Sequence, residues 1–252
     1  MKKLIISFLI SLLILSCSPQ IATDTETDKT ETGDLPDAAG WYSKGTSIND
    51  PNQQIEYFTK AIETKSDFSS AYLERAQAYL KTGRYEQTIA DIDTFIKSNP
   101  DVAEAYRIRG KAYEAIRYLN EALDDYTKAL ALNPQPQTYL ERANLYKERK
   151  RYTKAILDYT EVLKEIKDNA DVYIARGVCY QKLNQPKLAI QDYRKAIELR
   201  PDDADLYYNL GSIYWVQGRW QDVVKAWEKC LKLDPDHPRV RQYLPTARKK
   251  TE

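Results

Sequence analysis

Residues 103–135 read AEAYRIRGKAYEAIRYLNEALDDYTKALALNPQ, and this pattern recurs along the chain every 34 residues, with one interval of 33. Tyr106, Gly110 and Tyr113 lie at positions i, i+4 and i+7, which places them on one stripe of an α-helix. A second helix follows and carries Tyr126 on its inner side, and a proline near the end of the stretch prevents this helix from running on. The stretch therefore predicts two helices packed against each other as a hairpin.

The positions that define this hairpin recur in the other units. The first tyrosine has the equivalents Tyr72, Tyr139, Tyr173 and Tyr207. The small residue four places later is Ala76, Ala143, Gly177 and Gly211, and the large residue of the second helix is Ile92, Tyr159, Tyr193 and Trp227. Gly83 and Gly218 fall where hairpins turn, and Asp101, Asn169 and Asp202 stand where they can cap first helices. The small residues predict close approach of the two helices.

A charge pattern accompanies the repeat. In four units an arginine of the first helix is followed sixteen residues later by an aspartate of the second helix: Arg75 and Asp91, Arg109 and Asp125, Arg142 and Asp158, Arg176 and Asp192. The last unit has Leu210 and Ala226 at these positions, so both charges are lost together. The pattern predicts an ion pair inside each of the four hairpins and assigns these carboxylates a structural role.

The recurring tyrosines, small residues and closing prolines resemble the tetratricopeptide repeat (TPR) family over roughly residues 38–237. The resemblance implies an all-α fold, a right-handed superhelical solenoid of about six helix-turn-helix hairpins followed by a short C-terminal capping helix. The units are expected at residues 38–68, 69–102, 103–135, 136–169, 170–203 and 204–237, and the cap and tail at residues 238–252. The first unit is expected to be degenerate with a stunted first helix, and Pro245 predicts that the cap is short.

The N-terminal residues predict export and lipidation. A short positive segment is followed by an apolar run well below the ~20 residues that a membrane-spanning helix needs. Residues 14–17 read ILSC, which resembles a bacterial lipobox. Residues 1–16 are therefore expected to be a lipoprotein signal peptide and Cys17 the lipid attachment site. Residues 17–37, which are rich in Thr, Asp and Glu, are expected to form a disordered acidic tether.

No residue pattern typical of catalysis, metal binding or a cofactor occurs, so we expect no enzyme activity, no cofactor and no small-molecule substrate. Cys179 and Cys230 belong to no metal-binding motif and are expected to be buried packing residues without a disulfide. His237, the only histidine, is expected to be a solvated loop side chain. Charged residues make up 30% of the chain but the net charge is only +1, so no nucleic acid is expected as a partner.

The resemblance places ligand binding on the first helices, which line the concave face of a TPR solenoid. At the family's binding positions this chain has Arg107, Lys111, Leu140, Asn144, Ile174, Val178, Tyr208 and Trp215, with Glu114, Lys147, Gln181 and Ser212 as further members. The groove is thus expected to change from charged to apolar and aromatic towards its C-terminal end. Tyr208, Trp215 and Arg107 are the preferred contacts, although Tyr208 and Trp215 could instead pack beneath the cap. Glu141 stands where the family's carboxylate clamp needs an Asn, so that clamp is not expected.

Together these features predict a non-catalytic scaffold, lipid-anchored in a bacterial cell envelope, that holds a peptide or protein partner in its groove. The envelope process could be outer-membrane biogenesis, secretion or pilus building. Two alternatives stay open: a spacer or oligomerising solenoid without a peptide groove, and an accessory protein that binds peptidoglycan or a small ligand. Whether the anchor lies in the inner or the outer membrane is left open by the sequence.

Overall fold

The computed structural model describes residues 36–252. The expected signal peptide, Cys17 and nearly all of the expected tether lie outside these residues. Within them the structure contains thirteen α-helices and no strand, which confirms the all-α prediction.

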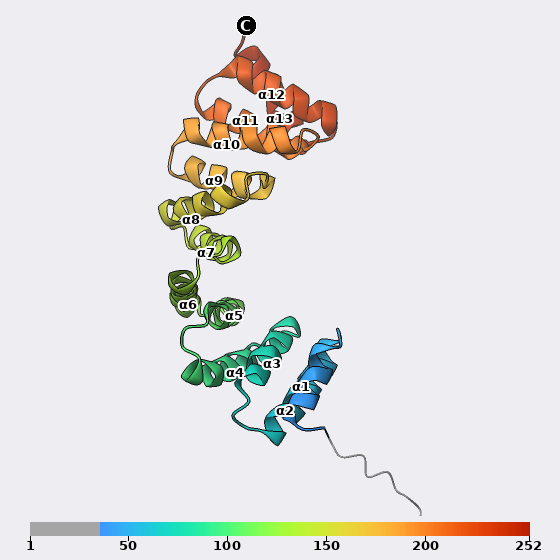
Figure 1. Cartoon of the computed structure of the whole chain (residues 1–252). Coiled ribbons are helices and arrows are strands. Elements are labelled where there is room, and N and C mark those ends of the chain that lie inside the picture. The colour runs from blue at the N-terminus through green and yellow to red at the C-terminus, as the bar shows by residue number, and fades with distance from the viewer. Residues whose placement is uncertain (1–35) are drawn as a thin grey trace, which may run out of the picture. The chain divides into compact units, whose positions relative to one another are not determined.

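The helices form six consecutive hairpins, which we call repeats 1 to 6, and one further helix (Figure 1). They are α1 (Ala38–Thr46) with α2 (Pro51–Thr64), α3 (Ser69–Lys81) with α4 (Tyr85–Ser98), α5 (Ala103–Ala115) with α6 (Leu119–Leu132), α7 (Pro136–Glu148) with α8 (Tyr152–Glu165), α9 (Ala170–Lys182) with α10 (Pro186–Leu199), α11 (Ala204–Val216) with α12 (Trp220–Leu233), and α13 (Pro238–Lys249). The first helix of repeat 1 has 9 residues, whereas α3, α5, α7, α9 and α11 have 13 each.

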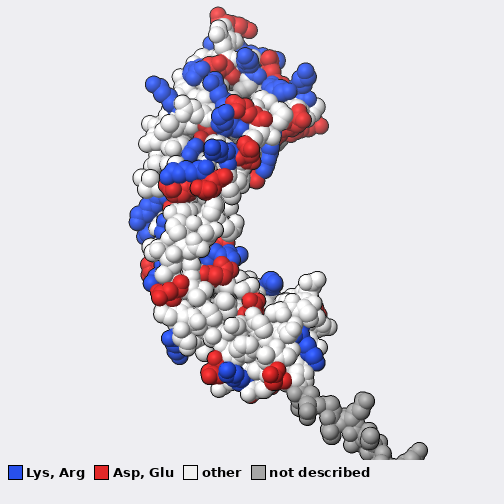
Figure 2. All heavy atoms as spheres, in the orientation of Figure 1, with Lys and Arg blue, Asp and Glu red and all other residues white. Residues whose placement is uncertain are grey.

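Each helix packs on its neighbours in the chain, and the first helices of consecutive repeats also meet where α3 contacts α5. The result is a solenoid of stacked hairpins within residues 36–252 (Figure 1). On the face drawn in Figure 2, basic and acidic side chains are interspersed along the array. Because each repeat contacts mainly the next one, the stability of such an array is close to a sum over repeats and their interfaces.

Large second-helix side chains fill the space inside each hairpin. Tyr126, Tyr159, Tyr193 and Trp227 are at most 3% exposed. Tyr126, Tyr193 and Trp227 face the glycine of their own first helix, at positions 110, 177 and 211. In repeat 6 the indole of Trp227 lies so close to Gly211 that an added Cβ would overlap it. In repeat 5 the nearest atom to such a Cβ at Gly177 would be 3.4 Å away, an ordinary contact. Close packing against Trp227 therefore requires a glycine at position 211, whereas the space at position 177 would also admit an alanine.

This difference predicts opposite effects of one substitution at equivalent positions. Gly211→Ala should destabilise the protein by about 1–3 kcal/mol, because the new methyl group forces Trp227 out of its packing. Gly177→Ala should stabilise it by about 0.5–1 kcal/mol, because alanine has the better helix propensity and the space exists. Urea denaturation followed by far-UV circular dichroism measures both changes. Equal signs for the two variants would contradict the packing difference.

The four predicted ion pairs are present and bidentate. In each, the arginine Nε and Nη2 both donate to the two aspartate oxygens at 2.8–2.9 Å. The aspartate side chains are only 5–8% exposed, so these pairs are buried on the carboxylate side. The prediction from the sequence is confirmed.

Each of these arginines also reaches the preceding repeat. Its Nη1 donates to a residue on the second helix of that repeat, at 2.5–3.0 Å, the acceptors being Thr59, Asp93, Thr127 and Thr160. In repeat 6, where leucine replaces the arginine, the direction is reversed. Arg194 of α10 donates to the hydroxyl of Tyr214 in α11 at 3.1 Å. A hydrogen-bonded ladder therefore joins repeats 1 to 6.

Two of the expected helix caps differ from those in the structure. Asn169 caps α9 as predicted, but α11 is capped by Asp203 instead of Asp202, and Asp101 does not cap α5, whose N-cap is Val102. The reason is that α5 and α11 begin one residue later than the motif suggested.

The capping helix α13 is longer than Pro245 led us to expect, since it has 12 residues and continues past this proline to Lys249. Pro245 lies on the exposed side of α13, so the carbonyl group that it leaves without an N–H donor faces water. Val240, Leu244 and Ala247 on the other side are buried and hold the helix against the array.

His237 is 7% exposed and not solvated, which corrects our expectation for this residue. It is the N-cap of α13, and its Nδ1 accepts a hydrogen bond from the backbone N–H of Val240 at 3.3 Å. The two other cysteines behave as predicted: Cys179 and Cys230 are free and buried, and burial raises the pKa of each thiol to about 11.

Candidate functional site

The charged part of the predicted binding surface lies on α5 and α7, and its side chains are already paired with one another. The guanidinium of Arg107 donates twice to Glu104, at 2.8 and 2.6 Å, and once to Glu141, at 2.9 Å. Lys111 Nζ lies 3.7 Å from the same oxygen of Glu141. Arg107 is therefore neutralised from within the chain, and a partner carboxylate would have to displace these contacts.

Two partly buried carboxylates, Glu114 and Glu141, add to the negative charge of this region. Burial raises the pKa of the Glu114 carboxyl above its ordinary value, and although a 2.6 Å hydrogen bond from the Tyr126 hydroxyl opposes this effect, the negative charge of Glu141 adds to it. The second oxygen of Glu141, Oε2, is buried and has no hydrogen-bond partner among the described residues. This part of the surface has an excess of acceptors over donors.

The middle of the predicted surface is largely used for packing. Leu140 packs on the core of repeats 3 to 5, and Ile174 and Val178 pack on the core of repeats 5 and 6. Asn144 accepts a hydrogen bond of 2.7 Å from the hydroxyl of Tyr159, which is buried. These four side chains link the charged part to the C-terminal end, and their role as partner contacts stays a prediction.

The C-terminal end of the surface contains a cavity of about 400 Å³. We call it the aromatic cavity, and it is lined by Gln181, Tyr208, Ser212, Trp215, Val216, Trp227 and Tyr243. No charged side chain lines it, and Val216 at its rim is 78% exposed. The lining thus combines aromatic ring faces with the amide of Gln181, the hydroxyl of Ser212 and the phenolic hydroxyls of the two tyrosines.

Stacked rings hold Trp215 in place. Its ring centre lies 5.3 Å from that of Trp227, with an interplanar angle of 24°, and 5.1 Å from that of Trp220, which it meets edge to face. Tyr243 of α13 lies 6.0 Å away on a further side. Trp215 thus packs against the capping helix and also lines the cavity, while its role as a partner contact stays a prediction.

Tyr208 is fixed in the same way. Its ring stacks on Trp227 at 6.3 Å and lies 4.8 Å from the ring of His237, and its hydroxyl interacts with Arg239 at 3.1 Å. Trp227 Nε1 in turn donates to the backbone carbonyl of Tyr208 at 3.2 Å. The aromatic cavity is therefore preorganised, which lowers the entropy lost when a ligand is bound.

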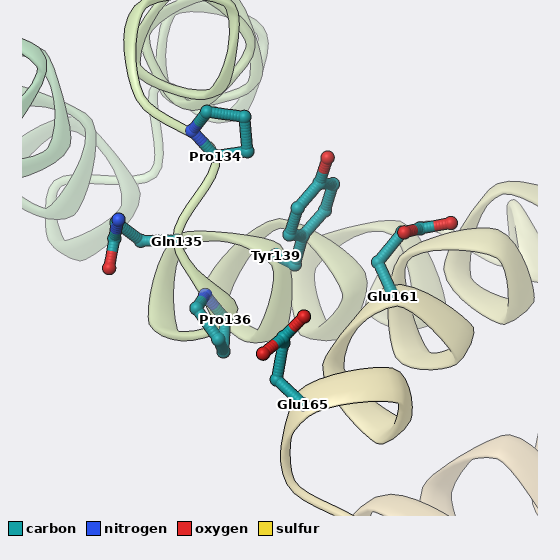
Figure 3. A pocket seen from close by; sticks show the side chains of 6 residues that line it. All are labelled: Pro134, Gln135, Pro136, Tyr139, Glu161 and Glu165. Atoms are coloured by element: carbon teal, nitrogen blue, oxygen red, sulfur yellow. The ribbon is translucent and has the colours of Figure 1, made fainter.

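A second cavity, of about 380 Å³, lies at the end of repeat 4 where α7 begins and α8 ends. We call it the repeat-4 cavity, and it is lined by Pro134, Gln135, Pro136, Tyr139, Glu161 and Glu165 (Figure 3). In Figure 3 the Tyr139 ring stands between Pro134 of the preceding loop and the two glutamates of α8, and Pro136 begins α7. This cavity is not part of the surface predicted from the sequence.

Neither a metal site nor a membrane span is seen in residues 36–252. No group of three or more His, Cys, Asp or Glu side chains in this part of the chain is placed to hold a metal ion. None of the thirteen helices combines the length and the apolar character needed to cross a bilayer.

Family models described as tetratricopeptide repeat or TPR repeat match residues 73–135, 136–169, 183–218 and 204–237. Together these matches extend over more than half of the chain. Those at residues 136–169 and 204–237 coincide with repeats 4 and 6, and the one at residues 183–218 spans α10 and α11. The chain is a tetratricopeptide repeat protein. A search of curated protein sequences finds no match.

Solved structures confirm the TPR fold. YrrB, described as a TPR protein with an unusual peptide-binding site, is 21% identical and aligns over 75% of this chain and 97% of its own, with a TM-score of 0.68. MamA is 22% identical over 67% of this chain and 94% of its own, with a TM-score of 0.60. MamA of Desulfovibrio magneticus is 18% identical over 68% and 97% of the two chains, also with a TM-score of 0.60. At these identities the likeness shows the fold alone.

The TPR motif identified Tyr208 and Trp215 but missed three residues that line the aromatic cavity, Val216, Trp227 and Tyr243. Trp227 belongs to a second helix, where the motif predicts packing, and Tyr243 belongs to α13, which lies beyond the last repeat. The participation of Tyr243 depends on how α13 folds back on the array, and no local pattern signals it. The distribution of tryptophans did indicate an aromatic cluster, because three of the four lie in repeat 6.

Proposed function

We propose that this TPR protein is a non-catalytic adaptor, anchored by a lipid in a bacterial cell envelope, that holds an extended segment of a protein partner on its first-helix face. TPR repeats are protein-interaction modules, which supports the general role as a scaffold. The observation that carries the proposal for this chain is the preorganised aromatic cavity formed by repeat 6 and α13.

The chemistry of the surface favours a particular kind of segment. The aromatic cavity is uncharged and suits a large apolar side chain, and aromatic anchors of this kind dominate the energy of peptide interfaces. Arg107 is neutralised by Glu104 and Glu141, so the surface does not require a free C-terminal carboxylate. YrrB, a protein of the same fold, is described as having a peptide-binding site, which supports a peptide as the kind of ligand.

Photo-crosslinking in cells tests the proposal. A photoreactive residue replaces Val216, which lines the aromatic cavity but is 78% exposed, so the ring stack stays intact. A matched control carries the same residue at Lys195 on α10, whose side chain is 57% exposed. We expect a discrete adduct at position 216 only, and its loss when Trp215→Ala is added to a chain that remains folded by circular dichroism.

Other outcomes would favour the alternatives drawn from the sequence. Equal or absent adducts at both positions would contradict a groove adaptor and favour a spacer. Titration of the purified protein with muropeptides, followed by tryptophan fluorescence, tests the peptidoglycan alternative. Saturable quenching that requires Trp215 would contradict a protein segment as the ligand of the aromatic cavity.

The lipid anchor rests on the lipobox at residues 14–17 and is tested separately. We expect Cys17→Ala to move the protein from the membrane fraction to the soluble fraction, or to leave it unprocessed, because no thioether bond to lipid can form. Unchanged membrane fractionation of fully processed protein would contradict the anchor. The partner adduct at position 216 does not depend on this result.

A further inference from the structure

In two repeats the first tyrosine of the first helix carries a lysine of the same repeat over its ring. Lys128 Nζ lies 5.7 Å from the centre of the Tyr106 ring in repeat 3, and Lys229 Nζ lies 5.7 Å from that of Tyr207 in repeat 6. Each lysine comes 22 residues after its tyrosine, on the second helix. An ammonium group at this distance is attracted by the negative face of the ring. This position is a cation site that the chain fills with its own side chain.

Repeat 4 departs from this arrangement at two positions. The residue 22 places after Tyr139 is Glu161. Four residues later Glu165 stands where the other repeats have Thr64, Ser98, Leu132, Leu199 and Leu233. Both glutamates and the tyrosine line the repeat-4 cavity (Figure 3). Where repeats 3 and 6 hold a lysine of their own, repeat 4 thus offers a tyrosine ring and two carboxylates.

The loop that closes this cavity adds to its character. Residues 133–135 make it one residue shorter than the four-residue connections between the other repeats. Pro134 and Pro136 lack an N–H, so the backbone of these two residues adds no hydrogen-bond donor to the cavity. The cavity is rich in acceptors and poor in donors, which suits a ligand that donates hydrogen bonds.

The charges around the cavity leave one negative charge without a partner. Lys164 donates to both oxygens of Glu161, at 2.7 and 2.8 Å, but its side chain is 60% exposed. Glu165 has no basic side chain within salt-bridge distance among residues 36–252. Arg142 lies 5.9 Å from the Tyr139 ring centre, but its guanidinium is bound to Asp158. A single cation would balance the remaining charge.

We propose that the repeat-4 cavity binds a primary ammonium group, supplied by a lysine side chain of a protein partner. The ammonium group lies over the Tyr139 ring and donates hydrogen bonds to Glu161 and Glu165, in the place that Lys128 takes in repeat 3. The methylene stem of the lysine packs on Pro134 and Pro136. This site is separate from the aromatic cavity, and it stands or falls independently of the proposed adaptor function.

A fluorine probe next to the site tests this proposal in the full-length chain. 3-Fluorotyrosine is placed at position 139, or at position 106 as the control whose ring already carries Lys128. The chain is titrated with N-acetyl-lysine amide and with N-acetyl-norleucine amide, which has a similar stem without the ammonium group. We expect a saturable fluorine shift with the lysine amide only, with half-saturation in the millimolar range usual for a single side chain, and only at position 139.

Two variants make the test specific. Glu161→Lys restores the lysine of repeats 3 and 6, so it should weaken binding at least about tenfold while circular dichroism shows an intact fold. Glu161→Gln keeps the size of the side chain and should weaken binding in the same direction. An equal response to the norleucine amide, or unchanged binding in both variants, would overturn the proposal.

Two further ligands define the class of cation and its source. N-acetyl-arginine amide bound tenfold more tightly than the lysine amide would replace the ammonium assignment with a guanidinium. 1,5-Diaminopentane bound tenfold more tightly would replace the protein side chain with a free diamine. Binding of the lysine amide at least as tight as that of either ligand supports the assignment to a protein lysine.

Discussion

Asp158→Ala is expected to destabilise the protein by about 3–5 kcal/mol, because it leaves the guanidinium of Arg142 without its charged partner at a largely buried position. The Asp158 side chain is 6% exposed and that of Arg142 16% exposed. Arg142 would keep only its bond to Thr127 on the preceding repeat. Urea denaturation followed by far-UV circular dichroism measures the loss.

The control for this variant is a surface pair of the same type. Arg219 and Asp222 lie one helical turn apart, and their side chains are 46% and 42% exposed. Asp222→Ala should therefore cost only about 0–1 kcal/mol. If Asp158→Ala lowered the free energy of unfolding no more than Asp222→Ala does, the buried ion pairs would contribute little to stability, and apolar packing alone would hold the fold.

Trp227→Ala should cost about 3–5 kcal/mol, as expected for a fully buried aromatic side chain removed from a core. Trp227 is 3% exposed, stacks on Trp215 and Tyr208, and donates a hydrogen bond to the Tyr208 carbonyl. Because repeat 6 has only one neighbouring repeat, the loss should be concentrated there and in α13. Amide hydrogen exchange should show faster opening of α11 to α13 than of α5 to α8.

Trp220→Ala is the matched control for this second prediction. Trp220 also contacts Trp215, edge to face, but it is only partly buried, so its removal should cost clearly less. Both variants alter the surroundings of Trp215, whereas only Trp227→Ala removes a lining residue of the aromatic cavity. A comparable loss of stability in the two variants would show that burial of Trp227 is not what holds repeat 6 together.

The hairpins and the ion pairs were predictable because both follow from residues at fixed spacing. The turns inside the hairpins were only partly predictable. Gly83 and Gly218 have positive φ, as glycines at such turns indicate, but Arg117, Lys150 and Asn184 take the same left-handed conformation at the turns of repeats 3, 4 and 5. Here the geometry of the hairpin overrides the local preference, and the residue type gives no signal.

The candidate sites were less predictable for a related reason. Tyr208 and Trp215 follow from the motif, but the wall formed by Tyr243 depends on the course of α13, which a proline seemed to interrupt. The repeat-4 cavity lies beside a loop that is one residue shorter than its equivalents, and it is lined by two glutamates at positions where other repeats have different residues. A sequence shows which residues differ from the repeat pattern, but it does not show whether those differences leave a cavity.

The reversed step of the ladder sets the order in which these modules can be joined. Repeats 2 to 5 each bring their own arginine and need only an oxygen acceptor on the module before them. Repeat 6 brings a tyrosine hydroxyl and needs an arginine, which the preceding module must supply at the position of Arg194. Repeats 1 to 4 have threonine or aspartate there, so of these modules only repeat 5 is a compatible predecessor. An array with reordered or deleted repeats would keep all of its inter-repeat hydrogen bonds only if repeat 6 still directly followed repeat 5.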